Sequence, residues 1–80
     1  MQVIYNYTGM YNMEIKRILA TNVRLLRAKK RFSQEAIAEL AGIGQNQVSE
    51  IENERSNPSL ETIVKLANAL ETQVFELFKG

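Results

Sequence analysis

The sequence contains no cysteine and no histidine among its 80 residues. Without thiols there is no disulfide framework and no cysteine-based metal site, and without imidazoles most hydrolytic machinery loses its usual base. No apolar run approaches the roughly 20 residues of a membrane span. The first 12 residues also lack the basic start and long apolar stretch of a secretory signal. We therefore expect a cytoplasmic protein, not an enzyme, that uses no cofactor and no metal.

Eighty residues suffice for one small domain. Apolar residues make up 45% of the chain, which is enough for a modest core that a second subunit would help to stabilise. The net charge is only +1, but residues 1–40 carry seven Lys and Arg against three acids, and residues 41–80 carry three against six. Six basic residues fall within residues 17–31. That asymmetry permits a basic face, although charge alone does not separate it from a solvated helix surface.

Residues 34–53, QEAIAELAGIGQNQVSEIEN, are the most informative stretch of the chain. Gly42 follows three apolar residues at helical spacing, Ile37, Leu40 and Ala41. A second short helical pattern with Val48 and Ile51 follows at once. A glycine between two helices too short to stand alone predicts a tight helix-turn-helix. Ala38 is small enough for a close crossing of the two helices, and Gly42 takes a positive φ without penalty.

This stretch closely resembles the helix-turn-helix of the phage Cro/repressor (XRE) family of DNA-binding proteins. The residues that carry the resemblance are Ala38, Gly42, Ile43, Val48 and Ile51. The resemblance runs from about Met13 to Gly80 and implies an all-α fold, a five-helix bundle forming a phage-repressor-like DNA-binding domain over residues 13–80. Residues 1–12 are aromatic and β-leaning and lie outside the family pattern. We interpret them as an N-terminal extension that is either disordered or a packed arm.

The apolar periodicity predicts helices over about residues 13–30, 34–41, 45–53, 60–70 and 74–79. Ser33 and Ser59 are the predicted N-caps, each with a hydroxyl that accepts from an early backbone N–H. The fourth helix carries the predicted apolar stripe Leu60, Ile63, Val64, Ala67 and Leu70. The family usually has glycine where Arg31 and Glu54 stand, so we expect Arg31 to adopt a strained left-handed conformation.

The third predicted helix has two unlike sides. At about 100° per residue, Val48 and Ile51 define its inward side. The opposite side carries Asn46, Ser49, Glu50 and Asn53, with Gln45 at the exposed N-terminal end. Amides and hydroxyls supply the donors and acceptors that base edges in a major groove require, whereas a merely solvated face favours Lys and Glu. We predict base contacts from Gln45, Asn46, Ser49 and Glu50.

The family resemblance implies phosphate contacts at the start of the second helix and around the loop after the third. The predicted phosphate contacts are Gln34, Asn53, Arg55, Ser56 and Asn57. Glu52 lies at the edge of the predicted core, where a carboxylate needs a partner. In the family an arginine late in the first helix pairs with this glutamate, and Arg27 matches that position. We predict a structural ion pair between Arg27 and Glu52.

The predicted fifth helix carries more apolar residues than one small helix buries on a single face. Either all of them complete the core, or some form a dimer surface, for which the candidates are Leu70, Val74, Phe75 and Phe78. The rival surface is the N-terminal segment of residues 3–5.

These observations predict a sequence-specific DNA-binding transcriptional regulator, a repressor that acts as a homodimer on a near-palindromic site in double-stranded DNA. The alternative is a protein-interaction or antitoxin-like module on the same fold, with weak DNA affinity and a toxin or antirepressor as partner. Glu50, Glu52 and Glu54 motivate this alternative because acids near phosphates are costly. A catalytic role has least support, since no nucleophile, base and oxyanion donor gather in the sequence. The operator, the regulated gene and the phage, restriction-controller or antitoxin context are not readable from the sequence.

Overall fold

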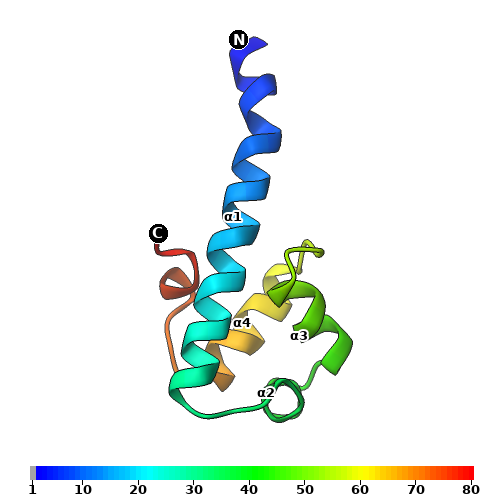
Figure 1. Cartoon of the computed structure of the whole chain (residues 1–80), viewed down its shortest axis with the longest axis vertical. Coiled ribbons are helices and arrows are strands. Elements are labelled where there is room, and N and C mark those ends of the chain that lie inside the picture. The colour runs from blue at the N-terminus through cyan, green and yellow to red at the C-terminus, as the bar shows by residue number, and fades with distance from the viewer. Residues whose placement is uncertain (1) are drawn as a thin grey trace.

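The computed structural model describes the backbone of residues 2–80 and the side chains of residues 13–80. It contains α1 (Gln2–Lys29), α2 (Gln34–Ala41), α3 (Gln45–Glu52), α4 (Leu60–Ala69) and the 3₁₀-helix η1 (Val74–Phe78) (Figure 1). Helix α1 contacts α3 and η1, α2 contacts α3 and α4, and α4 contacts η1. The C-terminal segment is fastened to α1 by Asn22, whose side-chain amide donates to the carbonyls of Leu77 at 2.9 Å and Lys79 at 3.0 Å.

The all-α class is confirmed, but the predicted count of five α-helices is not. Residues 74–78 form a 3₁₀-helix, the tighter winding that short connecting segments commonly adopt. Helix α1 begins at Gln2, before the predicted start near Met13. The predictions for residues 1–12, as an extension or as a rival contact surface, concern side chains outside the described residues. None of the helices within residues 2–80 is both long and apolar enough to span a membrane.

All four α-helices end in the same way, with one residue in the left-handed conformation. These residues are Arg31, Gly42, Glu54 and Glu71, with φ of 60°, 72°, 62° and 56°. At each end two backbone N–H groups turn back onto the last carbonyls; after α1, for example, Arg31 N–H donates to Ala28 at 3.0 Å and Phe32 N–H to Arg27 at 3.0 Å. This is the Schellman arrangement, which satisfies carbonyls that a helix end leaves unpaired. The left-handed conformation predicted for Arg31 is confirmed, and only one of the four positions holds glycine.

The helix starts follow from side-chain caps. The Ser33 hydroxyl accepts from the Ala36 N–H at 3.0 Å, and the Ser59 hydroxyl accepts from the Thr62 N–H at 3.1 Å, as predicted. At the start of α3, where Gly44 has no side chain, the side-chain oxygen Oε1 of Gln47 accepts from the Gly44 N–H at 2.9 Å. Each cap satisfies a backbone donor at or near a helix start.

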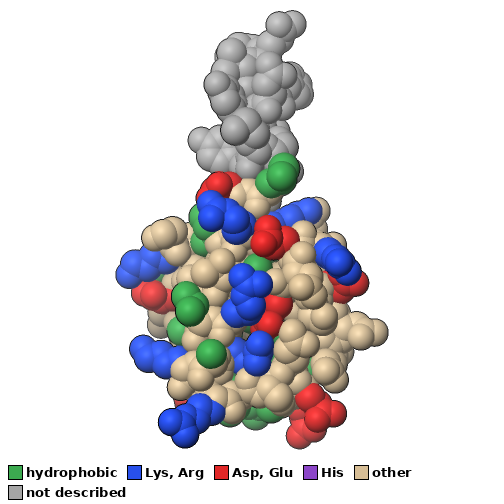
Figure 2. All heavy atoms as spheres, viewed as in Figure 1, with side chains coloured by type: hydrophobic (Ala, Val, Ile, Leu, Met, Phe, Trp, Pro, Cys, Tyr) green, Lys and Arg blue, Asp and Glu red, His purple; other side chains and the backbone are tan. Residues whose placement is uncertain are grey.

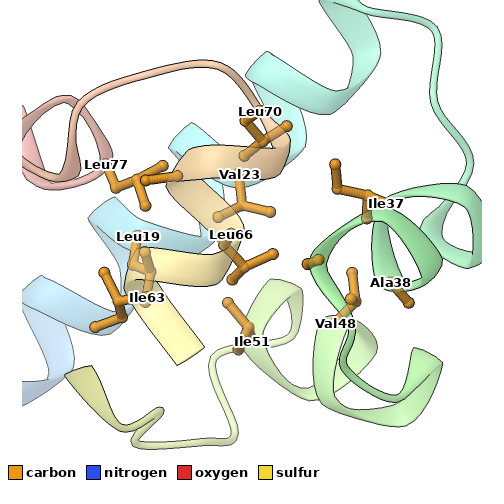
Figure 3. Close-up of a cluster of buried hydrophobic side chains, with 12 residues drawn as sticks. Leu19, Val23, Ile37, Ala38, Val48, Ile51, Ile63, Leu66, Leu70 and Leu77 are labelled. Carbon is orange, nitrogen blue, oxygen red and sulfur yellow. The ribbon is translucent and has the colours of Figure 1, made fainter. Parts of the chain in front are cut away.

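Every element contributes to a single apolar core (Figure 3). Its largest fully buried side chains are Val23, Ile37, Val48, Leu66, Leu70 and Leu77. On α2 and α4, three residues predicted for apolar stripes face solvent instead: Leu40 is 60% exposed, Leu60 71% and Val64 39%. At about 100° per residue, Leu40 stands roughly 110° from the centre of the buried side of α2. Leu60 and Val64 stand roughly 90° and 130° from that of α4.

Candidate nucleic-acid interface

Helix α3 presents a buried apolar side and an exposed polar side. Val48 is fully buried and Ile51 is 2% exposed, because both pack into the core. The predicted groove residues lie on the other side, where Gln45, Asn46, Glu50 and Asn53 are exposed and Ser49 is half-buried. Gln47 is exposed as well. The division of the helix into two sides is therefore the one that its periodicity predicts.

The last turn of α3 is stiffened by one of its own side chains. The Asn53 amide donates to the Ser49 carbonyl at 2.9 Å and lies 3.3 Å from the Ser49 hydroxyl oxygen. Because the hydroxyl accepts in this contact, it can still donate its own proton to another acceptor. The sequence predicts a phosphate contact for Asn53, but in the structure its amide nitrogen is directed at Ser49 of α3.

An open depression of about 400 Å³ lies between α3 and the segment that leads into α4. One wall consists of Asn46, Gln47, Glu50 and Ile51, and the other of residues 56–59 with Thr62. The depression therefore brings two predicted base-contact residues, Asn46 and Glu50, to the same concave surface as two predicted phosphate contacts, Ser56 and Asn57. Arg55 is exposed close by in the chain, whereas Gln34 stands at the start of α2, with its amide directed at Glu52 rather than into the depression.

Glu52 is the buried polar centre that joins α3 to the rest of the domain. It is 3% exposed, and both of its carboxylate oxygens are paired with Arg27: Nε donates to Oε2 at 2.7 Å and Nη2 to Oε1 at 3.0 Å. The Gln34 amide also donates to Oε1 at 3.0 Å. Arg27 Nη1 donates to the Phe32 carbonyl at 2.8 Å, so the same guanidinium also holds the loop between α1 and α2.

The ionisation of this pair follows from its contacts. Burial by itself raises the pKa of Glu52, but the hydrogen bonds from Arg27 and Gln34 outweigh that cost, and the pKa of this carboxyl lies below its usual value. The hydrogen bond to Glu52 in turn raises the pKa of Arg27. Both groups are therefore charged at neutral pH, and the two charges neutralise each other inside the domain.

Two contacts of this centre have no counterpart in the sequence prediction. Arg24 Nη1 donates to the backbone carbonyl of Glu52 at 2.9 Å, which places a cation at the C-terminal end of α3, where the helix dipole favours it. Gln34, assigned from the sequence to a phosphate, has its amide nitrogen on Glu52 instead. The sequence does indicate that Arg24 lies near this centre, because it stands three residues before Arg27 on the same side of α1. Its acceptor is a backbone carbonyl, which leaves no mark in a sequence.

The basic residues before α2 are largely engaged within the domain. Lys30 pairs with Glu71 at 2.7 Å and, through that hydrogen bond, lowers the pKa of Glu71. Arg17 pairs with Glu14, and Arg27 with Glu52. Figure 2 shows Lys and Arg interspersed with Asp and Glu on the visible face of the body. On this face the uneven charge of the sequence does not become one continuous basic patch.

No group of three or more His, Cys, Asp or Glu that could hold a metal ion occurs among the side chains that the structure describes. The exposed polar side of α3, the depression beside it and the buried centre behind it are thus the features that set this surface apart. They offer amide, hydroxyl and carboxylate groups on a helix whose orientation is fixed by Arg24, Arg27 and Gln34.

The chain is similar in sequence and in fold to known proteins. Residues 23–77 match the family model described as Helix-turn-helix. The control protein C.SmaI of Serratia marcescens is 42% identical over 65 residues, which cover 81% of this chain and 77% of that protein. The crystal structure of the hypothetical transcription factor NHTF from Neisseria shares 37% identity with a TM-score of 0.79, over 81% of this chain and 75% of that chain. The restriction-modification controller protein C.AhdI from Aeromonas hydrophila shares 38% identity with a TM-score of 0.76, over 79% and 96%.

Proposed function

The chain belongs to the Helix-turn-helix family of the XRE type, and from that premise we propose that it is a repressor that binds a near-palindromic operator as a homodimer. The family resemblance predicted from the sequence is confirmed, and the family is one of DNA-binding transcription regulators rather than enzymes. The observation that carries the proposal is the exposed polar side of α3, held outward by the buried contacts of Arg24, Arg27 and Gln34 with Glu52.

Helix α3 enters the major groove in this proposal, and Gln45, Asn46, Ser49 and Glu50 contact base edges. The groove of B-DNA admits an α-helix, and the amides of Gln45 and Asn46 match the donor and acceptor of an adenine edge. The Ser49 hydroxyl keeps a donor available because its oxygen already accepts from Asn53. The proposed mechanism of repression is steric, since a bound domain occupies DNA that RNA polymerase needs.

Phosphate contacts come from groups at both ends of the helix-turn-helix. Arg55, Ser56 and Asn57 border the outer side of α3, and the first N–H groups of α2 supply a second, uncharged contact. Gln34 stands at that helix start, with its amide nitrogen already held by Glu52. Four of the ten Lys and Arg form ion pairs with acids of the same domain, and a fifth, Arg24, donates to a backbone carbonyl. We therefore expect a modest number of released counterions when the protein binds DNA.

The proposal of a homodimer has a physical motive. One subunit of this size contacts only a few base pairs, which gives little specificity among the competing sites of a genome. A two-fold axis would place a second α3 about one DNA turn, roughly 34 Å, away. Phe75 is 65% exposed on η1 and is the strongest candidate contact, with Val74 and Phe78 partly buried beside it. Leu70 no longer belongs to this surface, because it is 1% exposed and lies in the core.

The alternative, a protein-interaction or antitoxin-like module, was motivated by three acids in or near α3. One of the three is withdrawn from DNA, since the Glu52 carboxylate is buried against Arg27. Glu50 and Glu54 remain on the exposed surface.

Selection of bound duplexes from a random pool, followed by titrations at several salt concentrations, tests the proposal. We expect a near-palindromic site, two protein chains per duplex and an affinity that falls measurably, with a modest slope, as the salt concentration rises. Transcription from a promoter that overlaps this site should decrease when the protein is added. A pool that yields no preferred sequence, with binding insensitive to salt, favours the protein-interaction module. An increase in transcription contradicts the repressor role.

A further inference from the structure

Glu50 is an unpaired carboxylate in the middle of the proposed groove side. It is exposed, and it lines the open depression together with Asn46, one helical turn before it. None of the four ion pairs formed by the described side chains includes it. Its backbone carbonyl accepts from the Arg55 N–H at 2.9 Å and closes the end of α3, but that bond leaves the carboxylate facing outward. A charge of this sign beside DNA phosphates costs affinity unless it meets a donor.

The base edges in the major groove present few hydrogen-bond donors, and the groups next to each donor differ between bases. An ionised carboxylate can only accept hydrogen bonds. Cytosine presents an N4 amino donor, whereas adenine presents its N6 amino group beside an N7 acceptor, and guanine and thymine present acceptors to the groove. A carboxylate therefore attracts the cytosine edge, is partly opposed at adenine and is repelled at guanine and thymine. We propose that Glu50 specifies a cytosine in each half-site by accepting a hydrogen bond from its N4 amino group; this rests on the proposed function.

The position of that cytosine relative to a second base follows from helix geometry. Asn46 and Glu50 stand four residues apart, which is about 6 Å along the axis of α3 at 1.5 Å per residue. Successive base pairs are about 3.4 Å apart. The base read by Glu50 is therefore one or two base pairs from the base read by Asn46. The contacts of Arg24 and Arg27 with Glu52, two residues further on, hold this end of α3 in place.

A carboxylate in this position acts more by exclusion than by attraction. Guanine or thymine would put acceptors against it, so wrong sites are penalised more than the right site is favoured. Replacing the carboxylate with an amide removes the repulsion and adds donors, and a glutamine pairs bidentately with adenine. Glu50→Gln is therefore expected to change the preferred base and to bind random DNA more tightly than the wild type does.

The experiment is a duplex selection with the wild type, Glu50→Gln and Glu50→Ala, followed by titration of four duplexes that differ only at the assigned base pair. We expect the wild type to prefer cytosine by roughly 10–100-fold, Glu50→Gln to select adenine, and Glu50→Ala to select no base there. All other positions should stay the same. Glu39→Gln is the matched control, because Glu39 is also exposed, forms none of the ion pairs among the described side chains and lies on α2, away from the groove side of α3.

The outcomes separate this inference from the proposed function. If the wild type selects no sequence at all, the proposed function itself fails. If the wild type and Glu50→Gln select the same base at every position, the protein reads DNA but Glu50 does not specify a base, and only the inference is overturned. The same holds if cytosine is preferred equally by the wild type and by Glu50→Ala. Thermal unfolding of each variant verifies that the substituted proteins are folded.

Discussion

Two glutamates on α3, only two residues apart, lie in opposite environments. Glu52 is buried and held by Arg27 and Gln34, whereas Glu50 is exposed and forms no ion pair among the described side chains. At about 100° per residue their side chains differ in direction by roughly 200° around the helix. The direction of each carboxylate therefore decides its role. Glu52, on the inner side, holds α3 in place, and Glu50, on the outer side, is available to a ligand.

The largest expected effect comes from breaking the inner contact. Arg27→Met strands a buried carboxylate, and we expect the free energy of unfolding to fall by several kcal/mol, about 3–5 for a fully buried pair. The double variant Arg27→Met, Glu52→Leu should recover much of that loss, because no buried charge remains. Urea unfolding of the two single variants and the double variant measures the coupling. Losses that simply add would mean that the two residues are not coupled.

A second contrast lies within η1, where Leu77 is fully buried and Phe75 is 65% exposed. We expect Phe75→Glu to yield folded monomers that have lost most of their operator affinity, since the second half-site is no longer held. Leu77→Ala should instead lower the free energy of unfolding by about 2–5 kcal/mol, as core truncations do. Sedimentation and thermal unfolding separate the two effects. Dimers of Phe75→Glu would move the interface elsewhere.

The inner glutamate also predicts how stability depends on pH. Its pKa is lower in the folded protein than the value of about 4.3 in an unfolded chain. The contribution of Glu52 to the free energy of unfolding is therefore complete above about pH 4.3, and it is lost as the pH falls through the lower pKa of the folded state. Glu52→Gln should reduce this acid-induced loss in unfolding titrations between pH 7 and pH 2. Glu50→Gln is the matched control, and an equal reduction by both variants would contradict the comparison.

The smallest expected effect concerns the left-handed helix ends. A residue with a Cβ costs roughly 1–2 kcal/mol in the left-handed conformation. Glycine avoids this cost but loses about 0.5–1 kcal/mol more conformational entropy on folding. Arg31→Gly should therefore raise the free energy of unfolding by about 0.5–1 kcal/mol. Gly42→Ala should destabilise it by about 1 kcal/mol, since a Cβ there meets no atom within 4 Å and only the backbone conformation is penalised. Thermal unfolding measures both. A destabilised Arg31→Gly variant would mean that the Arg31 side chain has a contact of its own.

The sequence predicts a structural feature well where the feature follows from the position of a side chain within its own helix. Val48 and Ile51 fix the two sides of α3, and Ser33 and Ser59 cap their helices as their positions indicate. The prediction that Leu60 and Val64 lie in the core is wrong. An apolar stripe in the sequence does not show how much of its width the neighbouring helices cover.

Backbone acceptors are harder still to predict. The bond from Arg24 to the Glu52 carbonyl and the left-handed conformation of Glu71 depend on backbone geometry, for which the side chains give no signal. The position of Glu52 at the core edge indicated that it needed a partner, and the family resemblance supplied Arg27. The third member, Gln34, was assigned to DNA instead, because an amide at a helix start fits either role. The bases that the outer side of α3 would contact depend on the DNA sequence as well, so the protein sequence alone does not give them.

We propose that the outer side of α3 contacts bases, whereas its inner side only holds the helix in place. The most direct test compares Asn46→Ala with the wild type on the selected operator and on random duplexes. We expect the substitution to cost roughly 1–3 kcal/mol on the operator and far less on random DNA, because the role proposed for the exposed Asn46 is to contact base edges rather than phosphates. Equal losses on both DNAs, measured at the same salt concentration, would contradict the claim.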